Sequence, residues 1–200
     1  EDLAEIAVRS QRNAVGNPNA VRFSPDMAVA DVMAEVPVAD PLRPSDLAAE
    51  SDGGCAIVLA AGDRARQLCG RPAWIRGIDH RIDAHGLGTR DLTRAPSAEL
   101  AASVACTTAD LAIESLDIAE LHSPATSQEA ILVRELGLGA ATEVNPSGGA
   151  LAANTLMAAG LVRIAEAARR IIDDRADRAL AHATSGPCLQ QNLACVMTGD

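Results

Sequence analysis

Two glycine-containing turns and one histidine have the residue types needed to hold a carbonyl or an anion. The segment Asn145–Gly149, with sequence NPSGG, precedes the helical pattern that continues to Ile164. A turn of this kind can present backbone N–H groups and a helix N-terminus to an anionic or carbonyl ligand. His122 ends an apolar run, and Ser185 and Gly186 open a second turn. No His, Cys or Lys lies within 145–164, so this turn is either an active-site loop completed by other residues or one that has lost its chemistry.

Alternating strand and helix patterns surround these residues. The apolar run Cys55–Ala60 (CAIVLA) predicts a strand buried on both faces, and a short helix, GDRARQLC, follows it. The last two expected strands are close enough in sequence to form a hairpin. The other expected strands and helices are strands 72–82, 116–122, 179–185 and 193–199 and helices 97–113, 127–138 and 155–172.

This alternation predicts an α/β fold with a mixed, mostly parallel sheet, helices on both faces and a C-terminal hairpin. Ligands bind such sheets at the C-terminal ends of the strands. His122, the 145–149 turn and the Ser185–Gly186 turn are all expected near that edge. In helix 155–172 we expect Met157 to face inward, and Arg163, Glu166 and Arg170 to face solvent, with an ion pair between the last two.

The first 50 residues have a different character. A helical pattern in residues 1–22 is interrupted by GNPNA, and residues 23–51 contain four prolines and a short helical piece near 26–35. We interpret residues 1–50 as the end of a preceding region with a connecting segment. Residues 51–200 are predicted to form the main domain.

Composition excludes several classes of function. The net charge of −10 and an aromatic content of 1% argue against nucleic acid as a partner. No apolar run is long enough to span a membrane, and no secretory signal is visible. Five cysteines without a C-x-x-C pair predict no disulfide framework, which favours a cytoplasmic location. His80 and His85 lack the clustered ligands of a metal site, so no metal is expected.

Four stretches in order resemble the C-terminal half of the thiolase superfamily, particularly the sterol-carrier-type and actinobacterial lipid-transfer thiolase-like proteins. These stretches are DGGCAIVLA, LDIAELHSPATSQEAILVRELGLG, VNPSGGALAAN and LAHATSGPCLQQNLACVM, and they cover roughly residues 51–200. Residues 1–50 resemble the end of the preceding half. The resemblance implies a layered fold of two similar halves, of which this chain would supply one.

The resemblance also implies catalytic roles. His122 matches the residue that holds a water for the oxyanion hole, and Cys188 lies about two residues from the position of an acid/base cysteine. The family's activating His is replaced by Asn154 or Thr155, and the nucleophilic Cys would lie in the missing half. Because an amide cannot take a proton at neutral pH, ordinary thiolysis by this chain alone is not expected. The residues implied to bind substrate are Asn145, Ser147, Gly148, Gly149, Asn154, Ser185 and Gly186.

Each assignment has a simpler alternative. His122 could be a strand-end residue that bonds to backbone, and the glycines could serve only a turn with positive φ. Asn154 is most simply an N-cap of the following helix. Cys188 could be an exposed turn residue. Cys55, Cys106 and Cys195 are expected in the core, and His182 inside the last sheet.

Two functions remain open. The first is a thiolase-like acyl-CoA acyltransferase or C–C bond-cleaving subunit of lipid or steroid metabolism, incomplete by itself, with a coenzyme A thioester as substrate and no other cofactor. The second is a non-catalytic acyl-CoA-binding or scaffold protein that supports an active partner. Expected partners are a second copy, another thiolase-like chain, or a small OB-fold acyl-CoA-binding protein. A half fold would expose apolar helix faces, so association is expected in either case.

Overall fold

A five-stranded mixed sheet organises the computed structural model, which describes residues 1–200. The strand order is β1-β5-β4-β2-β3. β2 is parallel to β3 and β4, whereas β5 is antiparallel to both β4 and β1, so only β5 runs against the other four. The bounds are β1 Trp74–Ile82, β2 Ile118–Leu121, β3 Glu143–Val144, β4 Arg178–Ser185 and β5 Gln191–Thr198. The expected mixed, mostly parallel sheet and its terminal hairpin, β4–β5, are confirmed.

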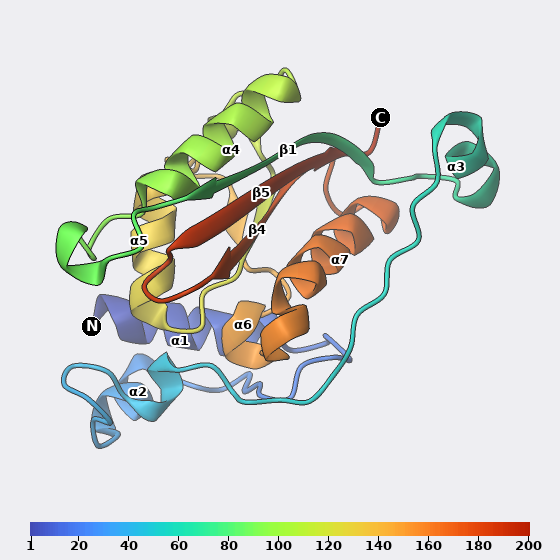
Figure 1. Ribbon diagram of the computed structural model, residues 1–200. Coiled ribbons are helices and arrows are strands. Elements are labelled where there is room, and N and C mark those ends of the chain that lie inside the picture. The colour runs from blue at the N-terminus through green and yellow to red at the C-terminus, as the bar shows by residue number, and fades with distance from the viewer.

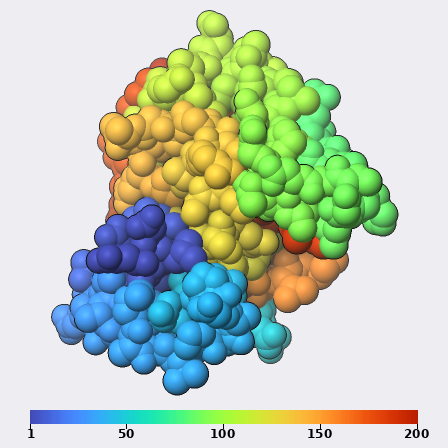
Figure 2. Space-filling model, turned by 90° about the vertical axis from the view of Figure 1, so that its left-hand side faces the viewer, coloured from blue at the N-terminus to red at the C-terminus, as the bar shows by residue number.

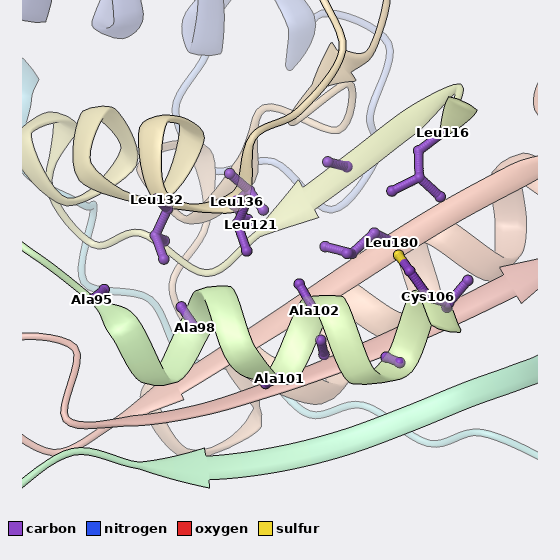
Figure 3. Packing of buried hydrophobic residues seen from close by; sticks show 14 of the residues in the cluster. Ala95, Ala98, Ala101, Ala102, Cys106, Leu116, Leu121, Leu132, Leu136 and Leu180 are labelled. Atoms are coloured by element: carbon purple, nitrogen blue, oxygen red, sulfur yellow. The ribbon is translucent and has the colours of Figure 1, made fainter. Parts of the chain in front are cut away.

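Helices cover both faces of this sheet (Figure 1). On one face α4 (Pro96–Thr108) and α5 (Thr126–Leu136) pack over β2, β4 and β5, and their buried side chains form the largest core cluster. On the other face α7 (Ala159–Ile172) packs with Ala167 and Ile171 against Ile118, Ala179 and Met197. Figure 3 shows Leu132 and Leu136 of α5 directed toward the alanine face of α4.

Small side chains bring α4 close to the sheet. Ala98, Ala101, Ala102 and Ala105 are completely buried. At Gly77 of β1, a Cβ atom would lie 1.9 Å from the carbonyl oxygen of Ala105. An alanine-rich core with almost no aromatic residues therefore packs through close backbone approach rather than through large side chains.

The N-terminal 50 residues form a separate layer below the sheet. α1 (Asp2–Asn13) packs on α5 and on the short helix α6 (Gly149–Ala152), and α2 (Val29–Ala34) and η1 (Pro44–Asp46) pack on α1. Figure 2 shows this blue and cyan part gathered at one end of the molecule. Helices in residues 1–22 and 26–35 are thus confirmed, whereas a domain boundary at residue 50 stays a prediction.

The predicted strand at Cys55–Ala60 is wrong for this structure. The segment is extended, but it pairs with no strand, and Val58 is 91% exposed. α3 (Gly62–Leu68) follows it at the edge of the molecule. The apolar run was interpreted as buried on both faces, but no element of this chain lies beside it to accept its hydrogen bonds.

Helix 155–172 also differs from the expectation. A 3-10 turn, η4 (Leu156–Ala158), precedes α7, and Met157 is exposed instead of inward. Arg163 and Glu166 are buried instead of facing solvent. Arg163 pairs with the buried carboxylate of Glu120 on β2. Glu166 pairs with Arg169 rather than with the expected Arg170. Helix 97–113 ends earlier, at Thr108, and the short turns η2 (Leu87–Thr89) and η3 (Ile113–Ser115) flank α4.

Candidate functional site

His122 stands directly after β2 and connects three segments of the chain. Its backbone N–H donates to the carbonyl oxygen of His182 on β4, at 3.2 Å. The ring Nδ1 lies 3.2 Å from the carbonyl oxygen of Thr184, and Nε2 lies 3.4 Å from Oδ1 of Asn154. The side chain is 8% exposed. His122 is therefore bonded to backbone, as the simpler alternative expected, and it also meets the amide that takes the place of the family's base.

The surroundings of His122 favour a neutral imidazole. Burial lowers the pKa of His122, and the nearby Arg163 guanidinium lowers it further, whereas the bonds to Asn154 and Thr184 oppose this shift. A neutral ring has one protonated nitrogen and can still donate one hydrogen bond. In this structure that N–H is directed at Oδ1 of Asn154 or at the carbonyl oxygen of Thr184, so a substrate carbonyl would receive it by displacing one of these two acceptors.

The glycine turn has the backbone that its sequence predicts. Gly148 has a φ of +91° and Gly149 a φ of +62°, and a Cβ on Gly149 would lie 2.8 Å from the side chain of Asn145. The turn needs glycine for its own geometry and for this close packing. Its N–H groups are already used: Ser147 donates to Glu120, Gly148 to the carbonyl of Asn145, and Gly149 to Oγ of Ser147.

Asn145 fastens the turn to β2. Its Oδ1 accepts a hydrogen bond from the N–H of Leu121 at 2.6 Å, and its Nδ2 donates to Oε2 of Glu129 at 2.7 Å. The residue is 2% exposed. Burial raises the pKa of the Glu129 carboxyl, and Arg9 of α1 and Asn145, both bonded to it, oppose the rise. The Asn145 side chain thus sets the position of the turn relative to the residue before His122.

A buried polar cluster lies behind the turn. Oγ of Ser147 donates to Oε2 of Glu120 at 2.7 Å, and Nη1 of Arg163 lies 2.8 Å from both oxygens. Burial raises the pKa of the Glu120 carboxyl, while Arg163 and Ser147 offset part of the rise. Sequence reasoning missed Glu120, Glu129 and Arg163. A charged residue inside the apolar strand LDIAEL was the available signal for Glu120.

Asn154 is not the N-cap of α7, because η4 intervenes and the cap residue is Ala158. Instead its N–H donates to Oγ of Ser51 at 2.9 Å, and its Oδ1 faces His122. Next to it, Oγ1 of Thr155 is buried without a hydrogen-bond partner. The position of the expected base therefore presents an amide and a hydroxyl, neither of which takes a proton at neutral pH.

The second turn begins directly after Thr184, whose backbone contacts the His122 ring, but its own residues do not bond to the site. Ser185, Gly186 and Cys188 are exposed, and Cys188 has a φ of +53°. Arg90 donates to the carbonyl oxygens of Pro187 and Cys188, at 3.0 and 3.2 Å. No hydrogen bond joins these residues to His122 or Asn154. The assignment of Cys188 as an acid/base residue stays a prediction, as do the substrate contacts of both turns.

The other cysteines and His182 are described by their burial and hydrogen bonds. Burial raises the pKa of the Cys106 and Cys195 thiols to about 11, which suits core residues. Cys55 is only half-buried, so its predicted core position is wrong. His182 is fully buried within the sheet, as expected, and bonds Oδ1 of Asn192 at 2.9 Å.

Two findings concern metals and membranes. No three His, Cys, Asp or Glu side chains are grouped so that they could hold a metal ion. None of the helices has the length and apolar character needed to cross a membrane.

Two hollows adjoin α7. A polar hollow of about 220 Å³ borders Gly149, Thr155 and Arg163, with Gly53 and Cys55 on its other side. A larger, apolar hollow of about 470 Å³ lies at the far end of α7 and contains none of the site residues. Neither hollow is lined by His122 or Asn154.

Comparison with known proteins finds relatives that are thiolase-like, although no family model matches the chain. It is 32% identical over 185 residues to an acetyl-CoA acetyltransferase of Methanothermobacter thermautotrophicus, covering 83% of this chain and 48% of the relative. It is 35% identical over 77 residues to a steroid side-chain-cleaving aldolase of Thermomonospora curvata, covering 38% of this chain and 20% of the relative.

The fold agrees with these relatives. The solved structure of an Ltp2-ChsH2(DUF35) aldolase superposes with a TM-score of 0.86 at 22% identity, and the match covers the whole of this chain and 58% of that one. The chain is thiolase-like in sequence and in fold. It spans about half the length of the relatives that match most of it.

Proposed function

We propose that this chain supplies the carbonyl-holding part of a thiolase-like enzyme that breaks or forms a C–C bond next to an acyl-CoA thioester in lipid or steroid metabolism. The observation that carries the proposal is the buried His122, held between Thr184 and Asn154 at the end of β2. The acetyltransferase and aldolase relatives support this class of reaction.

The proposed chemistry is polarisation of a carbonyl. In cleavage of a 3-hydroxyacyl-CoA, the C2–C3 bond breaks and its electron pair forms a thioester enolate. The hydroxyl gives up its proton and becomes a ketone or aldehyde carbonyl, and C2 later takes up a proton. His122, together with Asn154 or a water held by it, would donate to the enolate oxygen. The base, or a nucleophilic Cys in the thiolytic variant, would come from a second thiolase-like polypeptide.

The buried polar residues would hold the glycine turn and Asn154 in position. Asn145, Ser147, Gly148 and Gly149 hold the turn beside β2, and through it they fix the segment that carries Asn154. Three residues of the second turn are exposed in this chain: Ser185, Gly186 and Cys188. They would contact substrate once the partner polypeptide covers the turn. A small OB-fold acyl-CoA-binding protein is a further proposed partner. Five cysteines without a disulfide support a reducing compartment such as the cytoplasm.

Steady-state cleavage by the assembled protein tests this function. Purified assembly is supplied with 3-hydroxyacyl-CoA, or with 3-oxoacyl-CoA together with free CoA as the acyl acceptor, and the shorter acyl-CoA is measured by mass spectrometry. His122→Ala should lower kcat by about 100-fold or more, as loss of an oxyanion donor does. His80→Ala, at an exposed histidine on β1, is the control and should not change kcat. Equal rates for wild type and His122→Ala would contradict the proposal.

A non-catalytic acyl-CoA-binding or scaffold role is the second candidate. One inference from the resemblance favours it: Asn154 or Thr155 would replace the family's base. In that case the assembly would bind acyl-CoA without turnover, and His122→Ala would alter only affinity.

A further inference from the structure

The second turn, residues 185–190, contains two side-chain-bearing residues in the left-handed backbone conformation. Cys188 and Leu189 have φ values of +53° and +56°, and Gly186 has a φ of +74°. A Cβ atom disfavours this conformation, so Cys188 and Leu189 need contacts from outside the turn to hold it. Residues held in this way cluster at active sites and ligand-binding segments. The contacts that hold the turn therefore bear on what it does.

One long loop supplies several of these contacts. Loop 83–95 joins β1 to α4, and it lies with the second turn at the same end of the sheet (Figure 1). The N–H of Asp83 donates to the carbonyl oxygen of Gln190 at 2.8 Å. Nε2 of Gln190, a buried residue, lies 3.0 Å from Nδ1 of His85. The end of the turn is thus fastened to the start of the loop.

Arg90 of the same loop holds the middle of the turn. Its Nη2 donates to the carbonyl oxygen of Pro187 at 3.0 Å, and its Nη1 donates to that of Cys188 at 3.2 Å. Bonds to two successive carbonyl groups fix the orientation of both peptide planes. A guanidinium can make the two bonds together because its N–H groups form a planar fork, whereas the ammonium of Lys is a compact point charge.

The inner side of the turn is anchored in the core. Leu189 is 2% exposed and belongs to the largest core cluster. Nδ2 of Asn192 donates to the carbonyl oxygen of Leu189 at 2.8 Å and to Oγ of Ser97 on α4 at 2.6 Å. The turn is therefore held from within by the core and from outside by loop 83–95, while its outer edge stays exposed.

We infer that loop 83–95 is a clamp that keeps the second turn in one conformation beside His122, with Arg90 as its positioning residue. The turn follows Thr184, whose backbone contacts the His122 ring. The inference rests on the proposed function, in which the turn contacts the acyl-CoA substrate. A turn that is already in place needs less ordering when substrate binds, so the clamp would favour the reactive geometry. Arg90 acts through the turn and does not itself touch the substrate.

Backbone order parameters test the clamp in the 200-residue chain, without substrate. Relaxation of 15N nuclei should give order parameters of about 0.85 for Gly186 and Cys188 in wild type, and below about 0.6 in Arg90→Ala. Arg90→Lys keeps the charge but not the planar fork and should give intermediate values. Arg12→Ala is the matched control, because Arg12 also donates to a backbone carbonyl, that of Met27, at 2.9 Å in the N-terminal layer. It should leave both order parameters unchanged.

Turnover by the assembled protein tests the link to substrate. With 3-hydroxyacyl-CoA, Arg90→Ala should lower kcat by about 10-fold, because a turn that samples several conformations is in place for only a fraction of the time. Arg90→Lys should recover part of this loss. Arg12→Ala should have the kcat of wild type.

The two measurements separate failure of the clamp from failure of the proposed function. Order parameters below about 0.6 in wild type, or unchanged values in Arg90→Ala, would overturn the clamp whatever the turnover. Lower order parameters with an unchanged kcat would overturn its positioning role and leave the proposed function standing. If the wild-type assembly binds acyl-CoA without turnover, the proposed function fails, and the Kd of acyl-CoA decides the inference. Arg90→Ala should then raise this Kd by about 10-fold, and an unchanged Kd would overturn the inference.

Discussion

At the scale of single residues, burial determines which protonation state of His122 is favoured. Its ring contacts the backbone of Thr184 and the amide of Asn154, and no carboxylate bonds to it. Desolvation therefore has no opposing negative charge in contact with the ring, and the neutral form is favoured. A His that stays neutral can donate to a developing oxyanion across the physiological pH range, which is the role that the proposed function needs.

The titration of His122 provides one test. Because burial lowers the pKa of His122, the ring should stay neutral as the pH falls to 6.5 and should gain its proton only below that value. An NMR titration of the His122 ring protons in the 200-residue chain measures the midpoint. A midpoint above 6.5 would show that the ring is stabilised in its charged form and would remove the basis for a neutral donor.

Removal of the Asn145 side chain should weaken the protein through buried hydrogen bonds. Asn145→Ala removes the acceptor of the Leu121 N–H and the nearer of the two donors to Oε2 of Glu129, both in the interior. Loss of two such bonds should lower the free energy of unfolding by about 2–4 kcal/mol, measured by urea denaturation. Asn19→Ala, at an exposed asparagine whose side chain makes no hydrogen bond, should change it by less than about 0.5 kcal/mol. Equal effects of the two substitutions would contradict the positioning role of Asn145.

At the scale of elements, the contact between α4 and β1 depends on the absence of a side chain at one position. A Cβ at Gly77 would lie 1.9 Å from the Ala105 carbonyl oxygen, which is backbone and cannot rotate away. Gly77→Ala should therefore lower the free energy of unfolding by about 3 kcal/mol or more, and the same urea denaturation measures it. Gly54→Ala, where a Cβ meets nothing within 4 Å, is the matched control. A neutral Gly77→Ala would mean that α4 lies farther from the sheet.

The hairpin of β4 and β5 should be sensitive to acid through His182. Burial lowers the pKa of His182 to about 4 from its ordinary value of 6.5. The folded state therefore binds this proton less readily than the unfolded state, and His182 contributes stability above pH 6.5 that is lost as the pH falls toward 4. The loss should approach about 3 kcal/mol.

A non-titrating variant isolates the contribution of His182. His182→Gln should be less stable than wild type at pH 7.5, and its free energy of unfolding should change less between pH 7 and 4.5. Guanidinium denaturation at several pH values measures both. If wild type and variant lose stability in parallel over this range, another group is responsible for the acid sensitivity.

Much of this arrangement could be predicted from local sequence. Alternating apolar runs and helical periods identified four of the five strands, three of the principal helices and the hairpin, because burial against a sheet imposes these periods. The glycine turn was recognisable for the same local reason: its positive φ values require glycine. His122 was correctly placed at the end of β2.

Other features could not be predicted, because they depend on distant partners. Arg163 and Glu166 looked like solvent-facing charges on a helix, and only the fold brings Glu120 beneath Arg163. Asn154 looked like a cap, and its meeting with His122 is a tertiary contact. The segment 55–60 shows the same limit, since its apolar run predicts a buried strand, but no strand of this chain pairs with it.

At the scale of the whole molecule, helices cover both faces of the sheet and the site is buried, whereas one side of the molecule exposes apolar side chains. Exposed apolar residues on this side lie in the segment 55–60, in α3 and on the outer face of α7, among them Val58, Leu68 and Ile172. The site at His122 contains a hydrogen-bond donor but no adjacent nucleophile. Both observations agree with the proposal that the chain acts together with a second polypeptide.

The most direct test of the central claim is the infrared frequency of a thioester carbonyl bound at the site. An acyl-CoA labelled with 13C at its carbonyl is bound to the assembled protein, and the labelled band is isolated as a difference spectrum. We predict a band at lower frequency than in solution, because hydrogen bonds from His122 and Asn154 polarise the carbonyl, and return of the band toward its solution position in His122→Ala. A bound thioester with the same frequency in wild type and His122→Ala would contradict the account.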